Sequence, residues 1–226
     1  MVNLQNVTVK YGNNVVYQNF SFTFQKGVNV VLGKSGCGKT TLLKTIAQLV
    51  DYSGKCQADG KIAVVFQRPC LAPVSVMQNV KLVSDANENQ LCEILRQAEI
   101  LHKRNENAAK LSGGEQQRVA LARMFAAQGE VLLLDEPFSN LDYGTKTSLR
   151  RTFLNMTDGD KTVIFVTHDI EDAVAVADRI YLLEGNPCQI SFVAQPQTPA
   201  RLRDEFGDES NALRQTLHNL FDGAKR

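Results

Sequence analysis

One stretch of the chain matches the phosphate-loop pattern G-x-x-x-x-G-K-S/T at every fixed position: Gly33-Lys34-Ser35-Gly36-Cys37-Gly38-Lys39-Thr40. Its glycines allow a tight turn and a close approach of the backbone to a polyphosphate. Backbone N–H groups at the start of the following helix attract anionic oxygens. Lys39 supplies a mobile positive charge for the terminal phosphates, and the Thr40 hydroxyl is placed to ligate Mg²⁺. The stretch therefore predicts a nucleotide phosphate site.

The residues on either side support this prediction. Residues 28–32 form an apolar run typical of a buried strand, and residues 41–47 have a helical pattern. A strand, the loop and a helix in this order are the context that the motif requires. The alternative, a glycine-rich turn that matches by chance, is disfavoured by this context. Within the loop, Cys37 is interpreted as a small filler residue rather than as a redox switch.

Three further apolar runs predict buried strands, and each is followed by a residue that can do chemistry. They are residues 62–66, 131–134 and 162–166. Gln67 follows the first, Asp135 and Glu136 follow the second, and His168 comes soon after the third. Ligands of open α/β sheets bind at the carboxyl ends of strands. We expect Asp135 to hold a metal, Glu136 to act as a base and His168 to be functional. For Gln67 alone, an amide that caps the strand is the alternative.

A second candidate anion site lies far along the chain, at Ser112-Gly113-Gly114-Glu115. Ser112 and Glu115 have the S-x-x-E spacing of a capping box, and a helical pattern follows. Exposed N–H groups and the helix dipole favour an anion there, but the dipole contributes only about 0.3–2 kcal/mol. The element therefore needs other groups to bind a phosphate, and an ordinary helix cap is the alternative.

The remaining patterns indicate an α/β fold with a mostly parallel sheet. Alternating runs within residues 2–31 predict an N-terminal antiparallel β patch. Residues 51–60 are polar and contain two turn signals, and residues 71–110 carry a helical stripe without a strand signal. Residues 179–184 give a last strand, and residues 201–219 are expected to be helical. Tyr11, at the first turn, could stack on a purine, although a lone aromatic is more often a surface or core residue.

Composition restricts the class of protein. The 226 residues carry a net charge of +1, which gives no reason to expect a nucleic-acid partner. No apolar run approaches the roughly 18 residues that cross a bilayer. The N-terminus lacks the pattern of a signal peptide. Five scattered cysteines without a C-x-x-C pair favour a reducing cytosol.

Taken together, these motifs resemble the ATP-binding cassette family, the nucleotide-binding subunits of ABC transporters. Residues 33–40 resemble Walker A, Gln67 the Q-loop and Leu111-Ser112-Gly113-Gly114-Glu115 the signature. Residues 131–136 resemble Walker B with its catalytic glutamate, residues 139–142 the D-loop and His168 the switch histidine. The order of the motifs also matches. The resemblance covers almost the whole chain, and its signature is highly specific.

The resemblance implies a phosphate-loop NTPase core with an inserted helical subdomain. One ABC ATPase domain would span residues 1–226, with its core at 1–70 and 118–195, the helical subdomain at 71–117 and a C-terminal helical tail at 196–226. ATP would bind between Walker A of one copy and the signature of a second copy. Catalytic roles fall to Glu136, His168 and Gln67, and Mg²⁺ ligation to Thr40, Gln67 and Asp135. The implied nucleotide contacts are Tyr11, Gly33, Lys34, Ser35, Gly36, Cys37, Gly38, Lys39, Thr40, Thr41, Ser112, Gly113, Gly114, Glu115 and Asp142.

The branch of the family is indicated by residues 66–73 and by Asn79-Val80, which are similar to the nitrate/sulfonate/taurine importer group. This implies an ATPase that powers a bacterial small-solute importer. Its partners would be transmembrane permease subunits and a substrate-binding protein, and it would lie in the cytoplasm against the inner face of the membrane. Two alternatives stay open: the ATPase of an exporter or lipid-handling complex, and a soluble ABC ATPase without a transport role.

Overall fold

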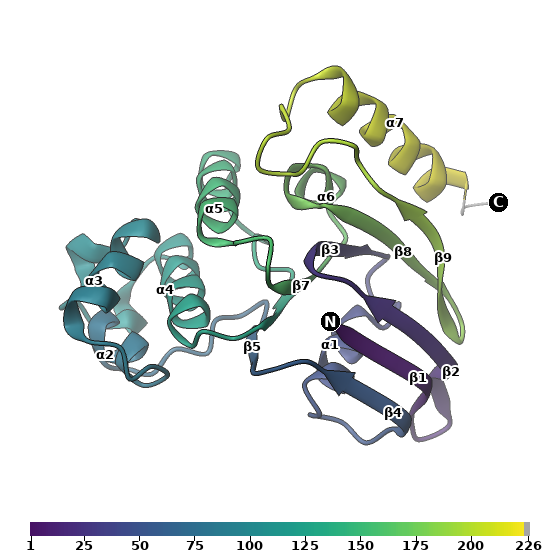
Figure 1. Cartoon of the computed structure of the whole chain (residues 1–226), viewed down its shortest axis with the longest axis horizontal. Coiled ribbons are helices and arrows are strands. Elements are labelled where there is room, and N and C mark those ends of the chain that lie inside the picture. Colours follow the sequence, from purple (N-terminus) through teal and green to yellow (C-terminus); the bar gives the residue numbers. More distant parts are fainter. Residues whose placement is uncertain (224–226) are drawn as a thin grey trace.

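The computed structural model describes residues 1–223, without the side chains of residues 192, 193 and 222. The last part of the expected tail, residues 224–226, lies outside the described residues. A six-stranded sheet in the order β5-β6-β7-β3-β8-β9 forms the centre of the molecule (Figure 1). Its strands are β5 (Ile62–Val65), β6 (Val131–Asp135), β7 (Thr162–Thr167), β3 (Gly27–Leu32), β8 (Arg179–Gly185) and β9 (Cys188–Ala194).

The central sheet confirms the predicted fold class. Every neighbouring pair from β5 to β8 is parallel, and only β9 at the edge is antiparallel. Strands β3, β6 and β7 are buried along their whole length, as their continuous apolar runs predict. The expected last strand corresponds to β8. A further strand, β9, was not expected, because its residues belong to a hairpin that turns back at the edge of the sheet.

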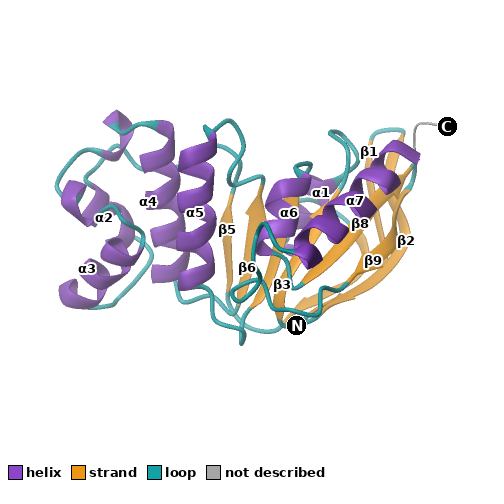
Figure 2. Cartoon of the chain, turned by 90° about the horizontal axis from the view of Figure 1, so that it is seen from above, coloured by secondary structure: helices purple, strands orange, loops and turns teal. Residues whose placement is uncertain are grey.

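Alternate residues of this sheet point to opposite faces and pack into two separate cores. Val30, Leu134 and Phe165 face a core that contains residues of α4 (Gly113–Ala126), α5 (Tyr143–Met156), α6 (Ile170–Val176) and α7 (Asp208–Gly223). Val31 and Leu133 face the opposite core, which is closed by α1 (Lys39–Ile46) and by a second sheet. The view from above shows α6 and α7 crossing the strands (Figure 2). Of the helix expected over residues 201–219, the part from Asp208 onward is confirmed in α7, whereas residues 201–207 form turns and bends.

The second sheet is the predicted antiparallel patch, with β1 (Val2–Tyr11) between β2 (Asn14–Phe24) and β4 (Ser53–Ala58). Of the two turn signals in residues 51–60, the one at Ser53-Gly54 was wrong, because these residues belong to β4, which pairs with β1, whereas Asp59-Gly60 forms a bend after the strand. The strand is mostly exposed, so it carries no apolar signal. Its glycine has a packing reason: a Cβ on Gly54 would lie 2.4 Å from the carbonyl oxygen of Asn6.

Residues 76–126 build a helical lobe to one side of the sheet (Figures 1 and 2). It contains α2 (Val76–Lys81), α3 (Glu88–Gln97), two short 3₁₀ turns (Leu101–Lys103 and Ala108–Lys110) and α4. Asn87 caps α3. Helix α4 belongs to both parts of the molecule: Val119 and Ala122 pack into the lobe, whereas Leu121 and Met124 pack against the central sheet.

The core around β7 gives a first prediction. Phe165 is fully buried, and its ring lies 5.4 Å from that of Phe138 and 6.0 Å from that of Phe153. Phe165→Ala should lower the free energy of unfolding by about 3–5 kcal/mol, because the cavity cannot close completely. Urea denaturation measures this. The control Phe206→Ala, at a ring that is 69% exposed, should stay within about 0.5 kcal/mol. Similar losses for both variants would contradict the assigned core.

Candidate functional site

The phosphate loop joins β3 to α1, as the motif requires. Lys39 is the first residue of α1, and Gly38 before it has a left-handed φ of 100°. The ammonium group of Lys39 donates to the carbonyl oxygens of Gly33 (2.8 Å) and Lys34 (3.1 Å), which holds it within the loop. A Cβ on Gly33 would come within 2.8 Å of the Leu183 carbonyl oxygen. The loop thus needs glycine both for its conformation and for its close packing.

The predicted strand-end residues meet at one edge of the sheet. Glu136, directly after β6, is their meeting point. Its carboxylate oxygens lie 3.6 Å from the Lys39 ammonium, 3.0 Å from Nδ1 of His168 and 3.4 Å from the amide nitrogen of Gln67. Lys39 comes after β3, His168 after β7 and Gln67 after β5, so the three partners belong to the ends of three different strands. The sequence prediction that these residues share one edge is therefore matched by the geometry.

Glu136 has an unusual backbone. Its φ is +45°, a left-handed conformation that costs a non-glycine residue about 1–3 kcal/mol. The Glu136 N–H donates to the Val166 carbonyl of β7 (2.9 Å), and its own carbonyl accepts from the N–H of Ser139 (3.1 Å). These two bonds fix the turn that points the carboxylate toward Lys39 and His168. Strain of this kind is concentrated at functional sites.

Asp135, the last residue of β6, is 6% exposed and faces the start of α1. The Thr40 hydroxyl donates to its carboxylate at 2.8 Å. Burial raises the pKa of Asp135, although the bond from Thr40 opposes that shift. A buried carboxylate beside a hydroxyl is a hard-oxygen donor set, the type that Mg²⁺ takes in proteins. The residues present therefore fit this ion.

The signature residues lie at the start of α4, in the helical lobe. Ser112 and Glu115 form the predicted capping box: the Glu115 carboxylate accepts from the Ser112 N–H at 2.8 Å. It also pairs with Lys103 at 2.9 Å. The ion pair with Lys103 and the bonds from Ser112 lower the pKa of Glu115 to about 2. Gly113 is open to solvent, since a Cβ there would meet no atom within 4 Å.

Gly114 and Asp142 belong to the same local group. A Cβ on Gly114 would approach the Thr145 side chain to 2.8 Å, and Asp142 accepts from Thr145 as the N-cap of α5. Helix α4 lies in the lobe, whereas α1 with the phosphate loop lies beside the sheets (Figure 1). The predicted nucleotide contacts are therefore divided between two parts of the chain. Tyr11 lies at the end of β1 and is 48% exposed.

Other predicted loop residues are placed by α1 and its turn. Lys34, Ser35 and Gly36 are exposed, while Cys37 is half-buried. Thr41 lies in the first turn of α1. These residues present an open surface beside the strand ends.

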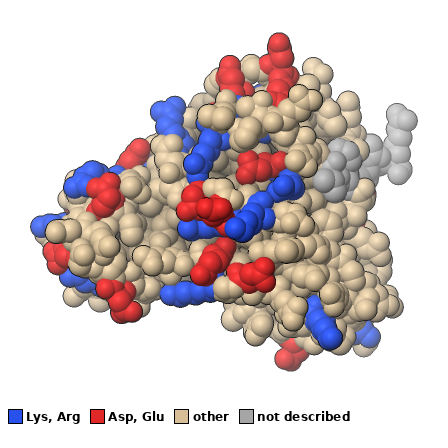
Figure 3. Space-filling model, in the orientation of Figure 1, with Lys and Arg blue, Asp and Glu red and all other residues tan. Residues whose placement is uncertain are grey.

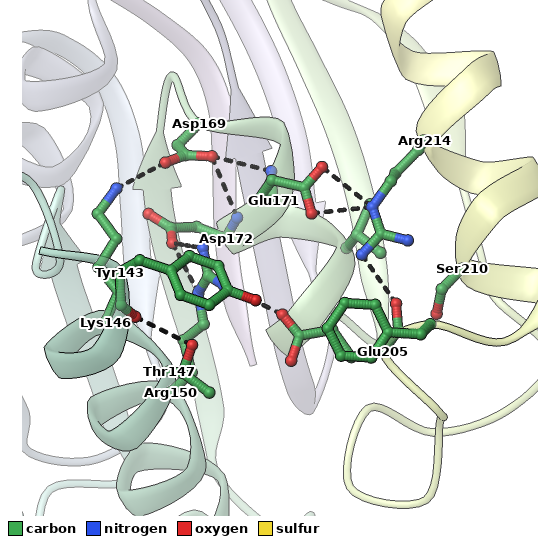
Figure 4. Close-up of polar contacts among 12 residues, drawn as sticks. Tyr143, Lys146, Thr147, Arg150, Asp169, Glu171, Asp172, Glu205, Ser210 and Arg214 are labelled. Atoms are coloured by element: carbon green, nitrogen blue, oxygen red, sulfur yellow. Dashed lines mark hydrogen bonds and ion pairs between the residues drawn. The ribbon is translucent and has the colours of Figure 1, made fainter.

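A network of ion pairs around Asp169, Glu171 and Asp172 was missed by the sequence prediction (Figure 4). Asp169, the residue after His168, caps α6 and pairs with Lys146 of α5 at 2.7 Å. Arg150 of α5 binds the buried carboxylate of Asp172. The network extends to the C-terminal region through Glu205 and through an Arg214–Glu171 pair. No local pattern could reveal these partners, because 22 to 55 residues separate them.

Comparison with known proteins decides the family. The family model described as "ABC transporter" matches residues 17–139, more than half of the chain.

The chain belongs to the ABC transporter family.

Similar ABC proteins are import subunits of bacteria. The chain is 35% identical to "Aliphatic sulfonates import ATP-binding protein SsuB 1" of Xanthomonas axonopodis pv. citri, covering 94% of this chain and 91% of the relative. It is 37% identical to the protein of the same description in Shouchella clausii, covering 94% and 89%. It is also 34% identical to "Fe(3+) ions import ATP-binding protein FbpC" of Fusobacterium nucleatum, although it spans only 65% of that relative.

Solved structures agree with this placement. An ATP-binding cassette in a dimeric, post-hydrolysis state bound to ADP and Pi superimposes with a TM-score of 0.75 at 28% identity, covering 88% of this chain and 100% of that one. The chain is therefore an ATP-binding subunit of the ABC transporter type, and an ATPase.

The signature helix gives a pH-dependent prediction. Glu115→Gln keeps acceptors for the capping box but removes the charge that faces Lys103. Because the folded pKa of about 2 lies below the ordinary 4.5, the charge stabilises the fold above pH 4.5 and this gain is lost as the pH falls toward 2. We expect a deficit of at most about 1 kcal/mol at pH 7, since the pair is partly exposed.

Urea midpoints from pH 7 downward measure this deficit, which should shrink below pH 4.5. A deficit that stays constant over that range would assign the effect to geometry rather than to charge.

Proposed function

We propose that this chain is the ATPase that powers a bacterial small-solute importer of the sulfonate type. The observation that carries the proposal is the convergence of Lys39, His168 and Gln67 on the Glu136 carboxylate beside a phosphate loop. The relatives named as import subunits favour import over the exporter and lipid-handling alternative. The substrates named for these relatives, aliphatic sulfonates among them, are those of the relatives.

In this proposal each residue at the sheet edge has a role. Lys39 and the loop N–H groups bind the β- and γ-phosphates, and Glu136 orients the attacking water and accepts its proton. His168 lies beside both Glu136 and the γ-phosphate, and Gln67 closes the other side of the site. Thr40 and Asp135 would hold Mg²⁺, with Gln67 as a further ligand. When bound, this ion supplies positive charge that offsets the phosphates. General-base assistance accounts for about 10²–10⁴-fold in rate.

The second half of the site would come from another copy of the chain. Ser112 to Glu115 present helix N–H groups in a lobe apart from the phosphate loop, and Gly113 leaves their surface open. A head-to-tail dimer would place this surface over ATP held by the partner's loop, with Asp142 next to it. Tyr11 would stack on the adenine. A dimeric cassette among the similar structures supports this arrangement.

The permease would dock in a cavity of about 680 Å³ between the outer strand β5 and the helical lobe. Its lining includes the segment after Gln67, the end of α2 and one face of α4. Leu82 at its rim is 64% exposed. On the face in Figure 3, acidic and basic side chains are interspersed rather than separated into areas of one sign. The cavity lining combines apolar side chains of β5, α2 and α4 with Lys61, Lys81, Arg123 and Asp85, so an amphipathic helix of a membrane subunit fits it.

Among residues 1–223, no helix is both long and apolar enough to cross a membrane. The relatives named as import subunits support a peripheral place for the chain, on the cytoplasmic face of the cell membrane, through its permease. Solute selection falls to that permease and to a substrate-binding protein.

Turnover tests the catalytic assignment. Glu136→Gln should bind ATP with unchanged affinity, lose at least about 10²-fold in turnover and accumulate as a dimer with ATP, because the water is no longer activated. Equilibrium binding, phosphate release and light scattering measure the three effects. His168→Ala should also lose turnover sharply. The control Glu93→Gln, on the exposed face of α3, should retain it. Near-normal hydrolysis by Glu136→Gln would refute the base assignment.

Docking is tested separately, in the cavity beside β5. Leu82→Asp should abolish co-purification with membrane subunits while ATP hydrolysis by the isolated chain stays within about twofold, because a charge would be buried on docking. Leu49→Asp is the matched control, since Leu49 is 58% exposed and lies outside the cavity lining. Loss of co-purification by both variants, or by neither, would reject the assigned docking surface.

A further inference from the structure

Two buried donors lie beneath the phosphate loop, and neither belongs to a recognised motif of this chain. The hydroxyl of Tyr17, on β2, donates to the carbonyl oxygen of Gly38 at 2.9 Å. The thiol of Cys188, on β9, donates to the carbonyl oxygen of Cys37 at 2.6 Å. Both side chains are at most 5% exposed. Strands from distant parts of the sequence thus supply one donor each to consecutive peptide groups of the loop.

The geometry of a trans peptide gives these bonds a consequence. The C=O and the following N–H of one peptide group point in opposite directions. A donor that holds the Cys37 carbonyl beneath the loop therefore turns the Gly38 N–H to the opposite side, and a donor on the Gly38 carbonyl does the same for the Lys39 N–H. These N–H groups belong to the start of α1, where a phosphate loop binds its anion.

Two other loop carbonyls are also occupied. Lys39 takes those of Gly33 and Lys34. The contact beneath the loop is close as well: a Cβ on Gly38 would lie 2.8 Å from Val16, 3.2 Å from the Tyr17 hydroxyl and 3.3 Å from the Cys188 sulfur. Burial raises the pKa of both donors, so the phenol and the thiol keep their protons at neutral pH.

We propose that Tyr17 and Cys188 are positioning residues that hold the phosphate loop in its anion-binding conformation before the nucleotide arrives. The inference rests on the proposed function, because it concerns the affinity of the same loop for ATP. Neither residue touches the nucleotide. Their contribution therefore lies in binding rather than in the chemical step, since the loop no longer has to be ordered when ATP binds.

Nucleotide affinity tests the proposal with three variants. Tyr17→Phe and Cys188→Ala each remove a donor and should raise the Kd for ATP about five- to tenfold, the lower part of the range for a lost buried hydrogen bond. The kcat at saturating ATP should stay within about twofold. Tyr17→Phe should fold, because the Gly38 carbonyl also accepts from the Leu42 N–H of α1. Cys188→Ser restores a donor and should return the Kd to within about twofold of the wild type.

Tyr181→Phe is the matched control. Tyr181 is 3% exposed and its hydroxyl donates to Asn29 of β3, away from the loop. We expect it to lower the urea midpoint about as much as Tyr17→Phe while leaving the Kd unchanged. Unchanged Kd values for Tyr17→Phe and Cys188→Ala would overturn the inference. So would an equal rise for Tyr181→Phe, or no rescue by Cys188→Ser.

The two proposals can fail separately. If the wild type binds ATP but the variants bind equally well, only the positioning role falls. If the wild type binds no ATP, the proposed function falls and the positioning role falls with it. Fluorescence titration with a labelled ATP analogue, competed by ATP, gives the Kd without relying on hydrolysis.

Discussion

The parallel register of β3, β7 and β6 is the constraint on which the site depends. Leu32 pairs with Thr167, and Asp135 pairs with Val166, so the three strands end within about one residue of each other. The phosphate loop, Glu136 and His168 therefore leave the sheet side by side. A slip of one residue would exchange the two faces of a strand and direct its apolar residues into the wrong core. The burial that specifies the register thus also specifies the site.

The sequence predicts those elements that a local pattern of apolar or capping residues identifies. Continuous apolar runs predicted β3, β6 and β7, and the capping box at Ser112 predicted the start of α4. Strands β4 and β9 were missed for the opposite reason: each lies at the edge of a sheet and is defined by backbone pairing, β4 with the distant strand β1 and β9 with its hairpin neighbour β8. Helix α2 was missed because its six residues are too few to establish a helical period.

The candidate site shows the same division. Gln67, Glu136 and His168 could be placed together from sequence, because each follows a recognisable strand and parallel strands end at a common edge. Tyr17 and Cys188 could not, since a buried tyrosine in an alternating strand and a lone cysteine carry no sign of the loop they contact. The ion pair of Lys146 could not be predicted either, because its partner Asp169 lies 23 residues away at the start of another helix. Sequence patterns thus find the residues that face a ligand more readily than the residues behind them.

The segment after β5 runs from the sheet edge that carries Glu136 to the cavity beside the helical lobe. The amide nitrogen of Gln67 lies 3.4 Å from the Glu136 carboxylate. A few residues later, Cys70 and Leu71 line the cavity beside the helical lobe. Arg123 of α4 donates to the Cys70 carbonyl at 2.6 Å, which ties this segment to the lobe. Helix α4 also carries the signature at its N-terminus. The backbone next to Gln67, the cavity lining and the helix that presents Ser112 are therefore joined by direct contacts. The path from the cavity to the sheet edge runs through Arg123, Cys70 and Gln67. Contacts already present in the fold therefore connect the cavity with Glu136.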